Sequence, residues 1–204
     1  MSVKAEFLFD FGSPNAFLAH RVIPHIEKRT GVKFVYKPVL LGGIFKATGN
    51  RSPAEAFAGI PAKLAYERKE TERFVRKHGI TEYASNPHFP VNTLMIMRGA
   101  VAAQALGVFE PYVEAVYRAM WVQGLKMDDP AVVREVLEKA GLPAERLLAM
   151  TQDAEVKARL IANTEAAVAH GVFGSPSFLV GQELYFGKDR LRDVEEEIAA
   201  QAAR

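Results

Sequence analysis

Phe9-Asp10-Phe11-Gly12-Ser13-Pro14-Asn15-Ala16 is the stretch of sequence that decides the fold. The apolar run over residues 3–9 leads into it and predicts a buried strand. Ser13 is a favoured residue for capping a helix, and Pro14 is tolerated in a first helical turn. We therefore expect a strand followed by a helix from residue 14 to about residue 29, kinked or locally adjusted at Pro24.

The sequence beyond this stretch extends the β–α unit into a longer order of elements. Residues 32–39 alternate like a second strand, and the short crossover makes the first two strands parallel. A long middle region has helical patterns at residues 61–78, 92–106, 111–122, 130–140 and 153–170. Strand patterns return at residues 176–180 and 184–186 around a tight Gly181-Gln182 turn, and a last helix is expected from residue 189 to about residue 200.

Without the helical block, the order is βαβ followed by ββα, which is the order of a thioredoxin fold. We therefore predict an α/β protein with a thioredoxin fold and a large inserted all-helical domain. The thioredoxin-like domain is expected at residues 1–40 and 171–204, and the inserted domain at residues 41–170. A chain of 204 residues can bury a core of this kind without disulfides or structural metals.

The composition argues against several classes of protein. The 26 Lys and Arg residues and the 24 Asp and Glu residues are interspersed, so no basic stripe predicts nucleic-acid binding. The longest apolar stretches are too short to cross a membrane, and the first residues do not resemble a signal peptide, so we expect a cytoplasmic protein. Because the chain has no Cys and its His residues lack metal-ligand spacing, we expect neither disulfide exchange nor a metal site.

Ser13 occupies a special place in the predicted fold. Redox proteins with a thioredoxin fold carry Cys-x-x-Cys at the start of the first helix, where backbone N–H groups and the helix dipole favour a thiolate. Here Ser13 stands at the first Cys position and Ala16 at the second. A site that favours an anion but has no sulfur of its own predicts that a ligand supplies the thiolate. A helix cap without further function is the simpler alternative.

Three other segments carry candidate binding residues. Ser175 precedes Pro176 at the start of the third strand, where a thioredoxin fold has a cis peptide bond and offers backbone groups to a peptide ligand; an ordinary strand-start proline is the alternative. Asp189 is a good N-cap for the last helix, and its carboxylate could also hold an ammonium group. Lys63 begins a helix, where a cation opposes the dipole and is either solvated or placed to bind a carboxylate.

Taken together, these motifs resemble one family. The first motif is Phe9-Asp10-Phe11-Gly12-Ser13-Pro14. It is followed, in order, by Gly49-Asn50, Pro61-Ala62-Lys63, Phe89-Pro90-Val91-Asn92-Thr93, Gly171 to Pro176 and Gly187 to Arg190. Over nearly its whole length the chain is similar to 2-hydroxychromene-2-carboxylate isomerases and to the closely related kappa-class glutathione transferases. Both groups resemble the bacterial disulfide-forming relatives of thioredoxin in fold.

The resemblance implies glutathione as the cofactor and points to residues that bind it. Ser13 matches the family's catalytic serine, whose hydroxyl bonds the glutathione sulfur. Ser175 matches the residue whose backbone pairs with the cysteinyl unit of glutathione. The other matches at the glutathione site are Asn50, Lys63, and the pair Lys188 and Asp189 at the γ-glutamyl end.

The activity implied by the resemblance is cis–trans isomerisation of a small aromatic carboxylate, such as 2-hydroxychromene-2-carboxylate, by reversible addition and elimination of the thiolate. A kappa-like transferase that leaves glutathione on its product is the alternative, and a non-enzymatic thioredoxin-fold binding module is the third interpretation. We also expect a homodimer. The segment from Leu40 to Lys46, expected as a loop that lines the substrate pocket, departs from the family pattern and leaves the substrate open.

Overall fold

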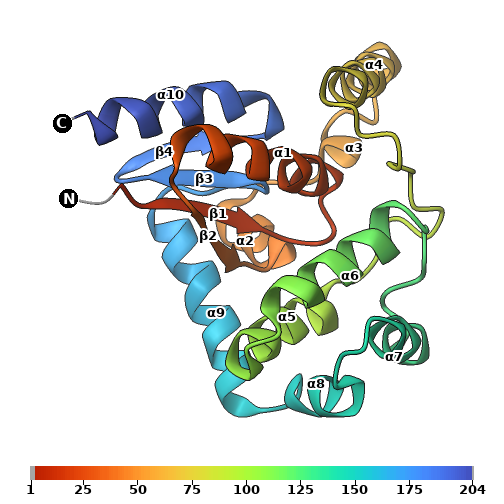
Figure 1. Ribbon diagram of the computed structural model, residues 1–204. Coiled ribbons are helices and arrows are strands. Elements are labelled where there is room, and N and C mark those ends of the chain that lie inside the picture. The colour runs from red at the N-terminus through yellow and green to blue at the C-terminus, as the bar shows by residue number, and fades with distance from the viewer. Residues whose placement is uncertain (1–2, 204) are drawn as a thin grey trace.

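A four-stranded sheet lies at the centre of the computed structural model, which describes residues 3–203 (Figure 1). Its strands, in the spatial order β2-β1-β3-β4, are β1 (Ala5–Phe9), β2 (Phe34–Pro38), β3 (Ser177–Val180) and β4 (Glu183–Phe186). Strand β1 is parallel to β2 and antiparallel to β3, which in turn is antiparallel to β4. The sheet therefore joins the N-terminal β–α–β unit to the C-terminal hairpin, as the sequence predicts.

Helices make up the rest of the regular structure. Helix α1 (Pro14–Thr30) connects β1 to β2, and a 3-10 turn, η1 (Lys188–Arg190), leads into α10 (Leu191–Ala202). The helices between β2 and β3 are α2 (Leu41–Thr48), α3 (Pro53–Ala56), α4 (Pro61–His78), α5 (Leu94–Leu106), α6 (Phe109–Trp121), α7 (Pro130–Lys139), α8 (Ala144–Met150) and α9 (Ala154–Ala169). This order matches the predicted fold class, whereas the division into two domains at residues 40 and 170 stays a prediction.

The two faces of the sheet are covered by different helices. Phe7 and Phe9 of β1 belong to the hydrophobic cluster that includes the buried faces of α1 and α10. Leu8, between them, belongs to a second cluster with Ile44 of α2 and Ala167 of α9. Figure 1 shows α1 and α10 on one face of the sheet and α2 and α9 on the other. The alternation of side chains along β1 therefore explains how one short strand packs against both layers.

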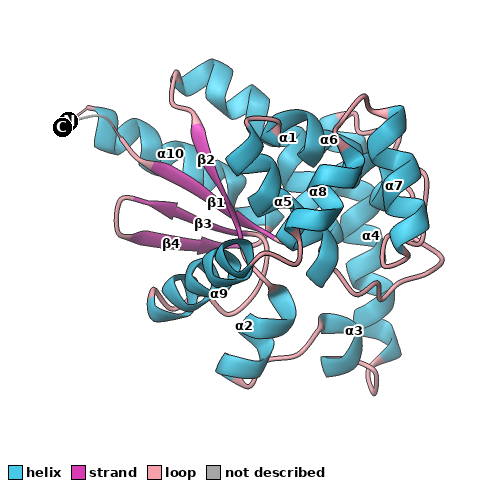
Figure 2. Cartoon of the chain, turned by 90° about the horizontal axis from the view of Figure 1, so that it is seen from below, coloured by secondary structure: helices cyan, strands magenta, loops and turns pink. Residues whose placement is uncertain are grey.

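An aromatic cluster connects the sheet to the inserted helices. The ring centroid of Phe11, just after β1, lies 4.8 Å from that of Tyr117 on α6, and Phe9 lies 5.9 Å from the same ring. The indole Nε1 of Trp121, at the end of α6, donates to the Phe11 carbonyl at 2.7 Å. Seen from below, the helices α5 to α8 lie together beside one end of the sheet (Figure 2). These contacts hold the turn between β1 and α1 from the side of the inserted helices.

The structure corrects the expectation of a loop at residues 40–46. This segment is helical from Leu41, because Ile44 is buried against the sheet and Gly49 ends the helix with a φ of 70°. A Cβ on Gly43 would lie 3.2 Å from the Thr164 methyl of α9, so glycine permits the close approach of the two helices. Two glycines in an eight-residue helix gave little helical signal in the sequence. Helix α1 continues through Pro24 without a break.

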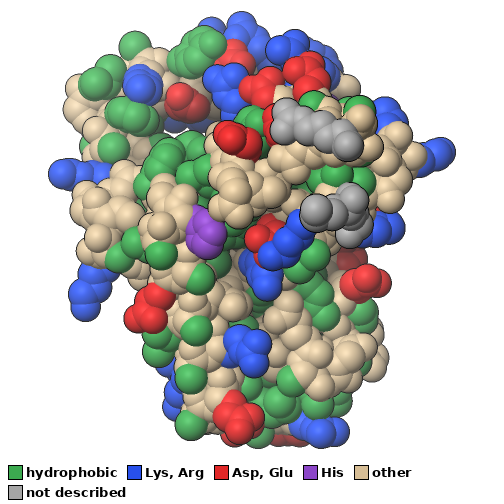
Figure 3. Space-filling view, turned by 90° about the vertical axis from the view of Figure 1, so that its left-hand side faces the viewer, with side chains coloured by type: hydrophobic (Ala, Val, Ile, Leu, Met, Phe, Trp, Pro, Cys, Tyr) green, Lys and Arg blue, Asp and Glu red, His purple; other side chains and the backbone are tan. Residues whose placement is uncertain are grey.

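The surface carries charges of both signs. Lys and Arg side chains are intermixed with Asp and Glu on the face of the molecule shown in Figure 3, and hydrophobic side chains lie between them. Among residues 3–203, no helix combines the length and the apolar composition that crossing a bilayer requires.

We predict that Gly99→Ala destabilises the fold. A Cβ at Gly99 of α5 would collide with the hydroxyl of Tyr112, which is buried and donates to the Ile96 carbonyl at 2.8 Å. Overpacking of this kind costs about 1–3 kcal/mol, more than the gain in helix propensity from glycine to alanine. Gly42→Ala is the matched control, because open space surrounds that position and the substitution should stabilise by roughly 0.5 kcal/mol. Thermal unfolding measures both, and a Gly99→Ala variant that melts above Gly42→Ala would contradict this account of the packing.

Candidate functional site

The turn between β1 and α1 presents Ser13 at the start of a helix. Ser13 is the N-cap of α1: its Oγ accepts from the Ala16 N–H at 3.2 Å, which confirms the predicted cap. The same hydroxyl donates to the Ser175 carbonyl at 2.8 Å. Ser13 is only 5% exposed, so its hydroxyl is held between the first helical turn and the loop before β3. An anion at this position would gain from the helix dipole and from a hydroxyl donor.

The loop before β3 faces this turn. The Ser175–Pro176 peptide bond is cis, as predicted from its place in the fold. The Ser175 Oγ accepts from the Asp10 N–H at 3.1 Å, so the side chain and the carbonyl of Ser175 both bond to the β1–α1 turn. The antiparallel register of β1 and β3, with Leu8 opposite Ser177, brings the two segments together. The Gly12-Ser13-Pro14 turn and the Gly174-Ser175-Pro176 loop are therefore in direct contact.

Asn50 lies next to the same loop, and Lys63 does not. The Asn50 Nδ2 donates to the Phe173 carbonyl at 2.7 Å, two residues before Ser175. Lys63, in the first turn of α4, is exposed, and its Nζ lies 3.7 Å from the centroid of the Phe57 ring. The structure thus joins Asn50 to the loop that carries Ser175, and it places Lys63 on the α3–α4 segment.

The expected N-cap role of Asp189 is wrong. Helix α10 begins at Leu191 with Arg190 in the cap position, and Asp189 lies inside the preceding 3-10 turn. Its carboxylate instead accepts from the Lys188 Nζ, at 2.7 and 2.9 Å from its two oxygens. The reason is that Lys188 turns inward: its side chain is 4% exposed, and its Nζ lies 4.8 Å from the Phe74 ring centroid of α4. A cation buried to this extent requires an anion beside it.

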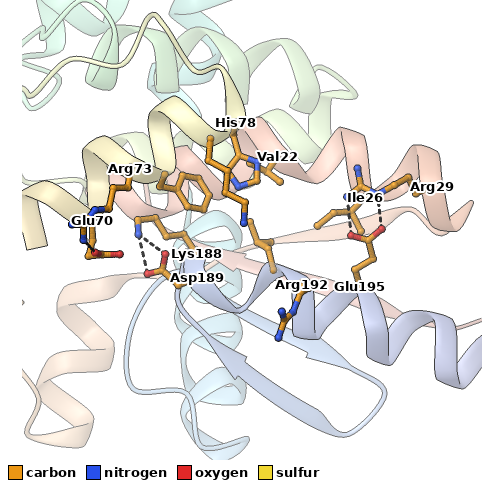
Figure 4. Close-up of a pocket in the computed structure, with 13 residues that line it drawn as sticks. Val22, Ile26, Arg29, Glu70, Arg73, His78, Lys188, Asp189, Arg192 and Glu195 are labelled. Carbon is orange, nitrogen blue, oxygen red and sulfur yellow. Dashed lines mark hydrogen bonds and ion pairs between the residues drawn. The ribbon is translucent and has the colours of Figure 1, made fainter.

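Lys188 and Asp189 border a groove of about 390 Å³ between α1, α4 and α10 (Figure 4). Its apolar lining includes Val22 and Ile26 of α1. Figure 4 also shows ion pairs along its rim, which are Lys188–Asp189, Arg73–Glu70 and Arg29–Glu195. The predicted site residues Ser13, Asn50, Lys63 and Ser175 lie outside the lining of this groove. Ser13, Asn50 and Ser175 therefore lie in one region and Lys188 and Asp189 in another at η1, while Lys63 lies apart from both on α4.

Sequence reasoning missed Asp10, which is fully buried at the end of β1. Its carboxylate accepts from the Gly12 N–H at 2.8 Å and from the Leu41 N–H at 2.7 Å. Burial raises the pKa of the Asp10 carboxyl, and hydrogen bonds from Leu41, Gly12 and the Thr93 side chain oppose that rise. An acid between two phenylalanines at the end of a buried strand was a signal that could have revealed it.

The cis peptide bond between Phe89 and Pro90 was also missed. It is the second cis peptide bond among the described residues, and Pro90 lies three residues before Thr93. Only the cis bond at Pro176 was expected, because only that proline has an established place in the predicted fold.

Comparisons with known proteins agree with this architecture. The sequence model of the DSBA-like thioredoxin domain matches residues 5–199, nearly the whole chain. The chain belongs to this family. Because one fold can host unrelated reactions, membership of this family does not by itself establish a reaction.

Named relatives narrow the resemblance. The chain is 27% identical over 193 residues to 2-hydroxychromene-2-carboxylate isomerase from Sphingobium xenophagum, with 94% of this chain and 95% of the relative covered. It is 28% identical to glutathione S-transferase kappa 1 from Homo sapiens, with 91% of this chain and 86% of the relative covered. A solved structure of 2-hydroxychromene-2-carboxylate isomerase has a TM-score of 0.83 and 25% identity, and covers 97% of this chain and 95% of its own. The resemblance stated from the motifs is therefore confirmed.

We predict that Asp189→Asn destabilises the ligand-free protein by about 1–3 kcal/mol, because it leaves the buried Lys188 ammonium without a charged partner. Lys188→Met should cost less. It removes the buried charge, keeps the contact with Phe74 and leaves an Asp189 side chain that is 66% exposed and can be solvated by water. Thermal melts of both variants test this order. If Asp189→Asn melted at the same temperature as the wild-type protein, the ion pair would contribute little to stability.

Proposed function

We propose that this protein is a glutathione-dependent isomerase that acts on 2-hydroxychromene-2-carboxylate or a related intermediate of aromatic degradation. The observation that carries the proposal is the position of Ser13. In a chain without Cys, the Ser13 hydroxyl is buried at a helix N-terminus and lies against the loop that contains a cis proline. The names of the relatives support the substrate class.

The groups at the site fit glutathione, which carries a thiol, two peptide groups, two carboxylates and an ammonium. Among residues 3–203, no group accepts a hydrogen bond from the Ser175 backbone N–H, so this donor is available to a peptide carbonyl. Asp189 is 66% exposed beyond its contact with Lys188, so its carboxylate can also accept from a ligand ammonium. Lys63 is exposed and can bind a carboxylate, and Asn50 supports the Phe173 carbonyl beside Ser175.

The chemistry that bound glutathione would supply is a thiol nucleophile for reversible addition to a conjugated carbon. A free thiol has a pKa of about 8.5, so a site that uses it at neutral pH must favour its anion. Ser13 and the first turn of α1 are suited to this task. The Ser13 hydroxyl, which donates to the Ser175 carbonyl at 2.8 Å here, can rotate to donate to an anion. The dipole of the 17-residue helix α1 acts in the same direction.

We predict that Ser13→Ala lowers turnover by about 10²–10³-fold at saturating glutathione, which is the usual cost of removing one donor to a developing anion. The variant also loses the α1 cap and a buried hydrogen bond to Ser175, so its stability should fall by roughly 1–3 kcal/mol. Asp129→Ala is the control, because it removes the N-cap of α7, away from the site. Equal turnover in the two variants, measured per folded protein, would refute the role of Ser13.

A kappa-like transferase is the second candidate, because the chain is also 25–28% identical to several kappa-class relatives. The two functions differ in what happens to glutathione. For the isomerase we expect free glutathione to be recovered quantitatively after many turnovers. Chromatography of the reaction mixture with an electrophilic substrate measures this, and consumption of one glutathione per product would favour the transferase.

A further inference from the structure

Asp10 forms hydrogen bonds to three separate segments of the chain. Its backbone carbonyl accepts from the Ser13 N–H at 3.1 Å, and its backbone N–H donates to the Ser175 Oγ at 3.1 Å. Its carboxylate accepts from Gly12 in the β1–α1 turn and from Leu41, the first residue of α2. One buried residue thus joins the helix start, the cis-proline loop and α2.

The surroundings of this carboxylate leave it little freedom. A Cβ added to Gly12 would lie 3.0 Å from the Thr93 methyl and 3.3 Å from the Asp10 Oδ1, so a side chain there would press on both. Each carboxylate oxygen has its own backbone donor, one from Gly12 and one from Leu41. Because Asp10 is 0% exposed, water cannot replace either bond without opening the structure.

Helix α2 has a second, independent tether. The Leu40 N–H, one residue before α2, donates to the Thr164 Oγ1 of α9 at 3.0 Å. This bond holds the start of α2 to α9 and does not touch the turn that carries Ser13. The Asp10 bond to Leu41, at 2.7 Å, by contrast joins the start of α2 to the turn that carries Ser13.

We propose that Asp10 is a positioning residue for the reaction: its carboxylate fixes the start of α2 relative to Ser13, and so sets where an electrophilic substrate meets the sulfur. This inference rests on the proposed function. Helix α2 enters it because Leu41 and Gly12 of the Ser13 turn bond the same carboxylate, so α2 begins beside the turn where the sulfur would lie. Asparagine cannot replace the aspartate in this role. It offers one acceptor oxygen to two facing N–H groups, and its own NH₂ would oppose one of them.

The test compares Asp10→Asn with Thr164→Val in the full-length protein. For Asp10→Asn we expect the KM for the aromatic substrate to rise about tenfold or more and kcat to fall, because the amide can accept from only one of Leu41 and Gly12 and its NH₂ opposes the other. For Thr164→Val we expect a smaller rise in KM with kcat unchanged, since only the tether of α2 to α9 is lost. Should Asp10→Asn fail to fold, Thr93→Val weakens the same cluster and should shift both constants in the same direction by a smaller factor.

Two further measurements separate this inference from the proposed function. Binding of glutathione to the wild-type protein, followed by calorimetry, tests the function alone. Amide hydrogen exchange at Leu41 and Gly12 tests only their hydrogen bonds to the Asp10 carboxylate, and we expect faster exchange in Asp10→Asn than in the wild type. A lowered melting temperature with unchanged kcat and KM would overturn the positioning role, as would equal exchange at Leu41 in the two proteins.

Discussion

The antiparallel pairing of β1 with β3 is the constraint on which the site depends. It places Leu8 opposite Ser177, so the C-terminal end of β1 and the start of β3 lie at the same end of the sheet. Segments 162 residues apart then meet, and the Ser13 hydroxyl reaches the Ser175 carbonyl. Because the sheet brings these ends together, the chain between β2 and β3 can hold many helices without separating Ser13 from Ser175.

Features that rest on local patterns could be predicted from the sequence. The Ser13 cap follows from a Ser-Pro pair before an apolar helical face, and the hairpin of β3 and β4 follows from two short apolar runs around Gly181. The cis bond at Pro176 followed once the order of elements identified the fold. These predictions needed no knowledge of which distant residues touch.

Features that depend on tertiary contacts could not be predicted in this way. Helix α2 contains two glycines and forms because Ile44 is buried and Gly43 allows contact with Thr164. Asp189 looked like a helix cap, but the inward turn of Lys188 onto Phe74 gives its carboxylate another partner. Asp10 acquires its role only when Leu41, 31 residues away, delivers an N–H to it. In each case a charge or a packing contact from another segment outweighs the local pattern.

The attachment of α4 has a mechanical consequence. Phe74, near its C-terminal end, is the buried residue of this helix, and it contacts the Lys188 ammonium of the sheet side. Lys63 lies at the exposed N-terminal end, 11 residues earlier, which at 1.5 Å per residue is about 16 Å away. The helix is therefore anchored near its C-terminal end, where the buried Phe74 ring packs against the Lys188 ammonium. A tilt of about 10° at Phe74 would move the backbone at Lys63 by about 3 Å, so the reach of that lysine is set by packing at the far end of the helix.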